Sequence, residues 1–341
     1  MIQWCLLLVV GLVGGLGFGW HLLTVTLLPP KPAMHSGYFG NGLTKPFAHR
    51  GSRLVFPQNT MFAFLGSVGM DANVVLEMDL RLTKDGEVVL THDEHLGGIT
   101  GHGEFKVEEL TLQQLEELDY GYTWSSEEGS FPYRGIGITI PRFEQVLQQF
   151  PHSLLNIELK IPGPLGGWFN GLNPQSLALA HKTCKLIRKY GAADRILLAS
   201  FSDPTWFKFR QSCPEVSTSA GPLGLLHLAL STLVSLPVTN VRYNAVQIHW
   251  KMAKWQNLIM HAQSNQLAVH VWTVNDIQEM KRLQQDAKVD GIMSDRLDWL
   301  LNVLNHNNSI HKIHFDGIPT GKICQLNPWF VQPGCATLGR V

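Results

Sequence analysis

The fold is decided by residues 74–93, VVLEMDLRLTKDGEVVLTHD. A short apolar run leads into Glu77 and Asp79, which are two residues apart and therefore project from the same face of an extended strand. Asp85-Gly86 follows, a dipeptide that favours a two-residue hairpin because it tolerates the positive φ of a type I′ turn. The stretch predicts two antiparallel strands with paired carboxylates on one face.

The register of this hairpin predicts which side chains meet. If the chain turns at Asp85-Gly86, Lys84 pairs with Glu87, and counting back along both strands sets Asp79 opposite His92. Two acids on one face repel each other unless a positive charge lies between them, and a divalent cation with oxygen ligands supplies that charge. The alternative is an exposed strand whose acids are solvated.

The rest of the chain alternates short β-branched runs with helical stretches, as is typical of a parallel sheet with crossover helices. We expect an α/β fold, a (β/α)8 TIM barrel with its reactive groups at the carboxyl ends of the strands. The antiparallel arm of the hairpin explains why one strand too many is predicted. The predicted strands are 46–49, 74–82, 88–92, 153–159, 195–201, 215–219, 245–249, 267–273 and 290–294.

Composition limits the function. The chain has 27 basic and 27 acidic side chains and no long basic run, which excludes a nucleic-acid partner. Charged residues make up 16% of the chain, below the roughly 25% of ordinary soluble proteins. A membrane connection would explain this deficit.

The N-terminal segment is the strongest membrane signal. Residues 1–28 contain no Asp, Glu, Lys or Arg, and a helix of this length can cross a hydrocarbon core of about 30 Å. We expect an uncleaved transmembrane anchor, with a cleaved signal peptide as the alternative. The positive residues that follow weakly favour a cytoplasmic globular domain. The expected domains are the anchor 1–28, a linker 29–45, the barrel 46–303 and a poorly ordered tail 304–341.

The five cysteines do not suggest a disulfide framework. Cys5 lies within the anchor, and Cys184 falls in a helical pattern where a small buried side chain is expected. Cys324 and Cys335 could pair in an oxidising compartment. We expect free thiols.

Short polar motifs follow one another at the predicted strand ends. The motifs are Ala48-His49-Arg50-Gly51, Pro57-Gln58-Asn59-Thr60, Glu77-Met78-Asp79, Thr83-Lys84-Asp85-Gly86, His92-Asp93, residues 140–147, Asn156-Ile157-Glu158-Leu159-Lys160, Val271-Trp272-Thr273-Val274-Asn275 and residues 290–295. Their order and spacing resemble the glycerophosphodiester phosphodiesterases over roughly residues 46–300. One departure is Gln58, where the family usually has glutamate.

The resemblance implies a metal-dependent hydrolase of lipid metabolism. Glu77, Asp79 and Glu158 supply oxygen ligands that suit Mg²⁺ or Ca²⁺. The remaining site residues are expected to move protons or to bind substrate. In this interpretation His49 and His92 are the general acid and base, Arg50 and Lys160 bind the phosphate, and Trp272 is an apolar wall for the glycerol.

Three functions fit these motifs. The leading hypothesis is hydrolysis of glycerophosphodiesters to an alcohol, such as choline or ethanolamine, and glycerol 3-phosphate. Alternatives are a lysophospholipase D that releases lysophosphatidic acid, an inactive lipid-binding barrel, and a related barrel that stops at a cyclic product. The expected partners are a small glycerophosphodiester or lysophospholipid and a membrane, and nothing in the sequence indicates an oligomeric state.

Two segments have open interpretations. Residues 97–139 are too long for a simple connection, and they form either the family's insertion that covers the site or a solvated excursion. Pro222 to Val238 is a second apolar segment without charged side chains apart from a histidine. We expect a barrel helix or buried loop there, and the sharper alternative is a mouth-lining segment that dips into a bilayer, as in the membrane-anchored branch of the family.

Overall fold

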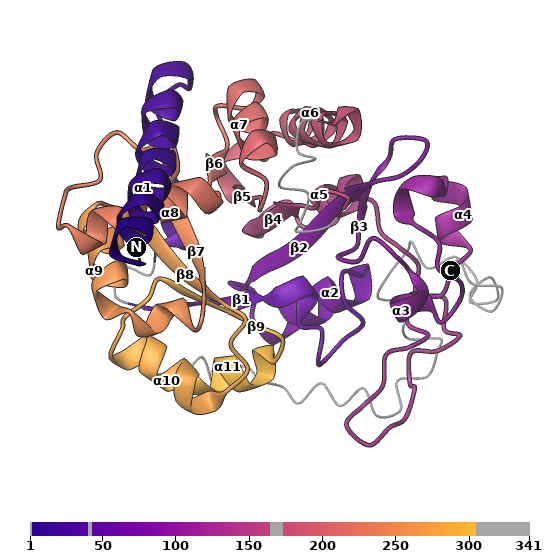
Figure 1. Cartoon of the computed structure of the whole chain (residues 1–341). Helices are drawn as coiled ribbons and strands as arrows, with labels where there is room; N and C mark the ends of the chain where they lie inside the picture. The colour runs from indigo at the N-terminus through magenta and orange to yellow at the C-terminus, as the bar shows by residue number, and fades with distance from the viewer. Residues whose placement is uncertain (1, 40–42, 164–172, 305–341) are drawn as a thin grey trace.

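The chain forms a parallel barrel surrounded by helices (Figure 1). The computed structural model describes residues 2–39, 43–163 and 173–304, and in the first helix it describes side chains from residue 14 onward. Each strand begins and ends within two residues of the bounds predicted from the sequence. The strands are β1 (Lys45–Ala48), β2 (Val75–Leu82), β3 (Val88–Leu90), β4 (Leu155–Leu159), β5 (Ile196–Ala199), β6 (Ser217–Thr218), β7 (Ala245–His249), β8 (Ala268–Trp272) and β9 (Gly291–Ser294).

The sheet is a nearly closed eight-stranded barrel. Its strand order is β6-β5-β4-β2-β1-β9-β8-β7, and β3 pairs only with β2. A single parallel bridge between Ser219 and Ala245 connects the two ends of the sheet. The predicted barrel is therefore confirmed, and the hairpin arm β3 is the extra strand.

Helices follow most strands, and several of them begin at side chains that satisfy free backbone N–H groups. Thr60, Asn173 and Asp276 each accept a hydrogen bond from the third residue of the helix that follows. The helices are α1 (Ile2–Leu27), α2 (Met61–Met70), α3 (Gly97–Thr100), α4 (Leu112–Glu116), α5 (Phe143–Gln149), α6 (Pro174–Lys189), α7 (Asp203–Ser212), α8 (Pro222–Leu233), α9 (Gln256–Ser264), α10 (Ile277–Gln285) and α11 (Leu297–Val303).

One end of the barrel is filled by apolar side chains. Phe47, Val75 and Leu197 from three strands pack together there with Tyr38. The Tyr38 hydroxyl donates to the carbonyl oxygens of Leu155 and Arg195 at 2.7 and 2.8 Å. Tyr38, which belongs to the predicted linker, thus packs into the amino-terminal end of the barrel and leaves the opposite end for polar groups.

The hairpin has a different register from the predicted one. The Thr83 N–H donates to the Glu87 carbonyl at 3.0 Å, so three residues rather than two form the loop, with Gly86 at φ +83°. The observed pairing, Leu80 with Leu90, shifts by one residue. His92 is consequently not opposite Asp79, and the prediction of that pairing was wrong.

The N-terminal helix packs on the barrel. The ring of His21 stacks on that of His227 in α8 at a centroid distance of 4.2 Å. Arg242 donates to the carbonyl of Val25 at 2.7 Å near the end of α1. Within the described residues no helix meets the length and apolarity needed to cross a membrane, so the predicted transmembrane helix lacks structural support.

The cysteine prediction needs a correction. Cys184 in α6 forms a disulfide with Cys213, which follows α7, and their Cα atoms are 5.8 Å apart. The two are far apart in sequence and belong to no recognisable spacing pattern, so only the packing of α6 on α7 brings them together. Cys324, Cys335 and the predicted tail lie outside the described residues.

The long insertion has a core of its own. Residues 97–139 contain α3, α4 and several buried side chains, among them Leu115, Tyr120 and Tyr133, which pack with Phe62 of α2. The segment lies beside the barrel (Figure 1), and none of its residues lines the cavity described below. The segment is therefore packed rather than a solvated excursion, and whether it covers the site stays a prediction.

Candidate active site

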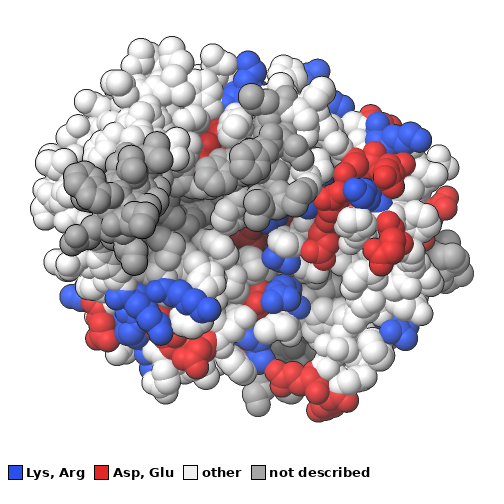
Figure 2. Space-filling view, viewed as in Figure 1, with Lys and Arg blue, Asp and Glu red and all other residues white. Residues whose placement is uncertain are grey.

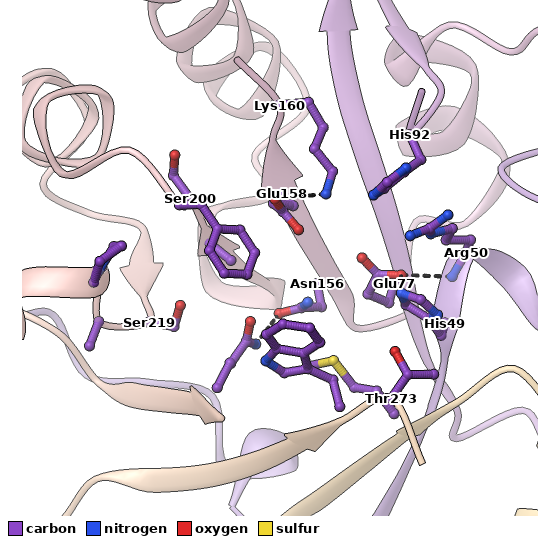
Figure 3. A pocket seen from close by; sticks show the side chains of 18 of the residues that line it. His49, Arg50, Glu77, His92, Asn156, Glu158, Lys160, Ser200, Ser219 and Thr273 are labelled. Carbon is purple, nitrogen blue, oxygen red and sulfur yellow. Dashed lines mark hydrogen bonds and ion pairs between the residues drawn. The ribbon is translucent and has the colours of Figure 1, made fainter. Parts of the chain in front are cut away.

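A cavity of about 330 Å³ opens at the carboxyl ends of the strands. Seven of the eight predicted site residues line it, and the eighth, Asp79, is buried directly behind them. Figure 3 shows the side chains of Glu77, Glu158 and Lys160 directed into this common space. The lining residues among those predicted are His49, Arg50, Glu77, His92, Glu158, Lys160 and Trp272.

Three carboxylates form the acidic centre of the site. Asp79 on β2 is the register partner of Glu158 on β4, and Glu77 lies two residues earlier on the same face. Oxygen atoms of the three groups lie within 4.8 Å of one another. Lys160 places its ammonium 3.2 Å from Asp79 and 2.8 Å from Glu158. The cluster therefore attracts positive charge, and a divalent cation fits its donor set.

The two carboxylates of β2 differ in their protonation equilibria. Burial, together with the charge of Asp79, raises the pKa of Glu77 well above its usual range. Burial alone would raise the pKa of Asp79 too, but Lys160 and Arg50 outweigh it and hold that pKa well below its usual range. Burial would lower the pKa of Lys160, and the neighbouring carboxylates Asp79 and Glu158 raise it instead. The protein compensates close negative charges with cations.

A left-handed turn after β1 places Arg50. Gly51 has φ +74°, and a Cβ there would lie 2.6 Å from the Cβ of Ala63, so only glycine fits. The turn directs the Arg50 N–H to the Glu77 carboxylate at 2.7 Å and brings Arg50 Nε to 3.3 Å from Asp79. The Arg50 guanidinium also donates to Gln58 Oε1 at 2.9 Å. Gln58 thus offers Arg50 a hydrogen-bond acceptor, as a glutamate would, but without the negative charge.

His49 is oriented by a buried acid. Its Nδ1 lies 2.6 Å from Asp295 Oδ1, and its Nε2 lies on the side of Glu77, 3.9 Å from that carboxylate. Burial lowers the pKa of His49, although Asp295 opposes this effect. Burial would raise the pKa of Asp295, but its bonds to His49 and Asn275 and the charge of Arg53 lower it to about 2. Asp295 is therefore ionised and holds the Nδ1 proton of a neutral His49.

His92 reaches the cavity from the loop after β3. Arg81 donates from Nε and Nη2 to the His92 carbonyl at 3.0 and 2.8 Å and so fixes the backbone. The Nδ1 atom of His92 lies 2.7 Å from Asp93 Oδ1. The side chain keeps 32% of its surface exposed, so it can meet a group that enters from solvent.

One wall of the cavity is apolar. Trp272 contacts the ring of Phe201 edge to face at a centroid distance of 5.5 Å. Pro222 and Leu225, at the start of α8, continue this wall. Part of the second apolar segment therefore lines the mouth as a barrel helix. The cavity offers charge on one side and hydrocarbon contact on the other.

Several supporting residues were not predicted. Asn59 donates to Asp79 Oδ2 at 2.8 Å and accepts from the Asp79 N–H at 3.1 Å. Asp295, Arg53, Asn275 and Arg81 also had no assigned role. Asn59, Asn275 and Asp295 belong to the quoted motifs, and this membership was the available signal.

Comparisons with known proteins agree with this geometry. The model of the glycerophosphoryl diester phosphodiesterase family matches residues 49–299. A glycerophosphodiester phosphodiesterase of Bacillus subtilis is 27% identical over 81% of this chain and 92% of its own. Lysophospholipase D GDPD1 of Homo sapiens is 25% identical over 85% of this chain and 96% of its own.

Solved structures share the fold. A glycerophosphoryl diester phosphodiesterase structure from Silicibacter pomeroyi, described as putative, has a TM-score of 0.65 at 23% identity and covers 80% of this chain and 96% of its own. A phosphodiesterase from Oleispira antarctica has a TM-score of 0.59 at 22% identity and covers 77% of this chain and 97% of its own. The chain belongs to the glycerophosphodiester phosphodiesterase family and is a phosphoric diester hydrolase of that family.

Proposed function

We propose that His49 and His92 carry the proton transfers by which this barrel hydrolyses glycerophosphodiesters. The products are an alcohol, such as choline or ethanolamine, and glycerol 3-phosphate. The observation that carries the proposal is the convergence of two histidines, carboxylates and two cationic side chains on one cavity. The Oleispira antarctica relative holds the product sn-glycerol-3-phosphate, which supports this substrate class. A complete set of reactive groups argues against an inactive lipid-binding barrel.

His49 is suited to the role of general base. Asp295 accepts a hydrogen bond from the Nδ1–H of His49, so the proton stays on Nδ1 and Nε2 carries the free lone pair on the side of the acidic centre. The base takes the proton of the attacking hydroxyl, from water or from the substrate's own glycerol, as that oxygen bonds to phosphorus. His92 gives a proton to the alcohol oxygen as the bond between that oxygen and phosphorus breaks. Attack by water gives glycerol 3-phosphate directly, whereas attack by the glycerol hydroxyl gives a cyclic phosphate that water then opens by attack on phosphorus.

We propose that Glu77, Asp79 and Glu158 hold a divalent cation, Mg²⁺ or Ca²⁺. All three offer hard oxygen donors, and these ligand atoms lie within 4.8 Å of one another. Such an ion would neutralise charge on a phosphate oxygen. Arg50 can donate two parallel hydrogen bonds to the phosphate, and Lys160 adds a point charge. Arg50 and Lys160 thus bind the phosphate through their own positive charges, in addition to the ion.

The test is a metal-dependent assay of the purified protein on glycerophosphocholine, following choline and glycerol 3-phosphate. We expect activity to disappear with chelator and to return with Mg²⁺ or Ca²⁺. Glu158→Gln should weaken the metal dependence, whereas Glu104→Gln, an exposed acid outside the cavity, should not. A stable cyclic phosphate as the final product would support the cyclising alternative, and activity indifferent to chelator would refute the metal site.

Lysophospholipids are a second candidate substrate class. The wall formed by Phe201, Pro222, Leu225 and Trp272 gives an acyl chain hydrocarbon contact beside the charged centre. Each buried methylene contributes about 0.8 kcal/mol, so even partial contact would favour the acylated substrate. The similarity to a lysophospholipase D in Homo sapiens supports this candidate.

We also propose that the N-terminal region associates with a membrane. Half of the large exposed apolar side chains in the described residues lie on α1 and at the end of α8, including Leu16, Leu22 and Leu233 at 58%, 68% and 69% exposure. Figure 2 shows few charges on the face that carries α1, at the upper left. Lys31 and Lys45 favour the cytoplasmic side, whereas the disulfide is typical of an oxidising compartment. Vesicle flotation tests the association by comparing the full chain with a truncated chain that lacks residues 1–28. We expect the full chain to float with the vesicles and the truncated chain to do so less.

A further inference from the structure

Below the acidic centre, two side-chain amides span the barrel. Gln247 on β7 donates from Nε2 to Asn156 Oδ1 on β4 at 2.6 Å. The two strands are separated in the sheet by β5 and β6, so this hydrogen bond crosses the interior. Asn156 is also the register partner of Glu77 and lies two residues before Glu158. Both amides line the cavity and form its polar floor.

The amide pair keeps hydrogen-bonding capacity for a ligand. The mutual bond uses one donor of Gln247 and the oxygen of Asn156. Within the described part of the chain, neither Asn156 Nδ2 nor Gln247 Oε1 has a protein partner, and neither is among the fully buried unpartnered atoms. The pair of lining residues therefore retains one donor and one acceptor for a ligand.

This pattern matches hydroxyl groups better than phosphate. A phosphate oxygen only accepts, and its donors are already provided by Arg50 and Lys160. A hydroxyl both donates and accepts, so two neighbouring hydroxyls complement one free N–H and one free carbonyl. Trp272 stands beside the floor and offers an apolar face to the carbon atoms that bear the hydroxyls.

We propose that Asn156 and Gln247 bind the free hydroxyl groups of the glycerol moiety, two in a deacylated diester and one in a lysophospholipid, and thereby determine specificity for glycerol-bearing diesters. This inference rests on the proposed function. A site that hydrogen-bonds a substrate hydroxyl discriminates strongly against analogues without it, because its own polar groups are then left unpaired. Asn156 lies close to Glu77 and Glu158, so a diol held there has its phosphate next to the acidic centre (Figure 3).

The test compares two diesters. Glycerophosphocholine carries the diol, and bis(4-nitrophenyl) phosphate has no hydroxyl. We expect Gln247→Met, which keeps the volume and removes the amide, to lower kcat/KM for glycerophosphocholine about 10- to 100-fold, mainly through KM. The rate on the nitrophenyl diester should change less than about threefold, because that substrate does not use the diol contacts. Gln285→Met, at an exposed position at the end of α10, is the matched control and should alter neither rate.

In the single variant Gln247→Met, the Asn156 side chain loses its hydrogen-bond partner, and a second variant removes this unpaired amide as well. The double change Asn156→Leu with Gln247→Met leaves no unpaired amide in the floor and should show the same selective loss. Equal losses on both diesters, or no loss on glycerophosphocholine, would overturn the inference while the wild-type activity stands. Wild-type protein that hydrolyses the nitrophenyl diester but no glycerophosphodiester would overturn the proposed function and the inference together.

Discussion

Asp295 and Asn59 hold reactive side chains in place without lining the cavity. Asp295 contacts His49, Arg53 and Asn275 through its two carboxylate oxygens. Asn59 binds both the side chain and the N–H of Asp79. At the scale of single residues, the proposed chemistry thus depends on partners that fix the tautomer of His49 and the rotamer of Asp79.

Replacement of either histidine by alanine should abolish most turnover. Loss of one proton-transfer partner lowers the rate about 10²- to 10⁴-fold, so His49→Ala and His92→Ala should each lose kcat to this extent. Circular dichroism should show an intact fold. His95→Ala, at an exposed position three residues after His92, is the matched control. Near-normal turnover of either variant would remove that histidine from the mechanism.

Asp295→Asn tests how His49 is tuned. The carboxylate opposes the effect of burial and raises the pKa of His49. Without its negative charge the imidazolium is less stable, so the pKa of His49 falls further and the acid limb of kcat/KM moves to lower pH. The rate at the plateau should fall about 10²- to 10⁴-fold, because the amide N–H that replaces a carboxylate oxygen can donate to Nδ1 and favour the wrong tautomer of His49. An acid limb that moves to higher pH would contradict this role.

Single residues also show what sequence reasoning can reach. Glu77, Asp79 and Glu158 were predictable because strand alternation and strand ends place them together. The position of His92 was predicted from a two-residue turn, whereas Thr83 closes a three-residue loop. The partner of His49 was unpredictable from spacing alone, because β1 and β9 are 246 residues apart at this contact and meet only through barrel closure.

At the scale of elements, α8 connects the site with the N-terminal helix. Its first turn carries Pro222 and Leu225 in the cavity wall. Its middle packs on α1 through His227, and its end exposes Leu233. An apolar sequence such as this one predicts a helix, but the choice between core, wall and surface depends on neighbours that the local pattern does not reveal.

Leu225→Asn should change substrate choice if acylated substrates are used. A polar side chain in the wall removes hydrocarbon contact, so KM for lysophosphatidylcholine should rise about 5- to 50-fold. KM for glycerophosphocholine should change less than about twofold, because the deacylated substrate has no chain to place there. Leu233→Asn, on the same helix but outside the cavity, is the control. Equal effects on both substrates would show that the wall is only core.

Asp203→Asn should make stability less dependent on pH. The Asp203 carboxylate caps α8 by accepting from the Leu223 N–H, and burial raises its pKa to about 7. Between its ordinary value and about 7 the folded protein holds a proton that the unfolded chain releases, so stability falls as pH rises through this window.

Asparagine keeps the acceptor without the charge. At pH 8 the Asp203→Asn variant should exceed the wild type in stability by roughly 1–4 kcal/mol, and near pH 4 the two should be similar. Denaturant unfolding at both pH values measures this difference. If the stability difference between the variant and the wild type did not depend on pH, the pKa of Asp203 would not be raised in the folded protein.

At the scale of the whole molecule, the barrel was largely predictable because its strands are short, apolar and regularly spaced. The packing of the N-terminal segment was not. Arg210 is fully buried and donates to the carbonyl oxygens of Pro29 and Pro30. Tyr38 fills the amino-terminal end of the barrel, and these contacts join regions that are far apart in sequence.

The disulfide provides the last prediction. It joins Cys184 and Cys213 across a sequence separation of 29 residues, and closing a loop of this size stabilises a protein by about 3–4 kcal/mol in the chain-entropy model. The double change of both cysteines to serine should therefore lower Tm by several degrees, while kcat/KM at low temperature stays unchanged because neither residue lines the cavity. Reductant should lower the Tm of the wild type to that of the variant and leave the variant unaffected. Rapid alkylation of both thiols in unreduced protein would contradict the bond and would remove the argument for an oxidising compartment.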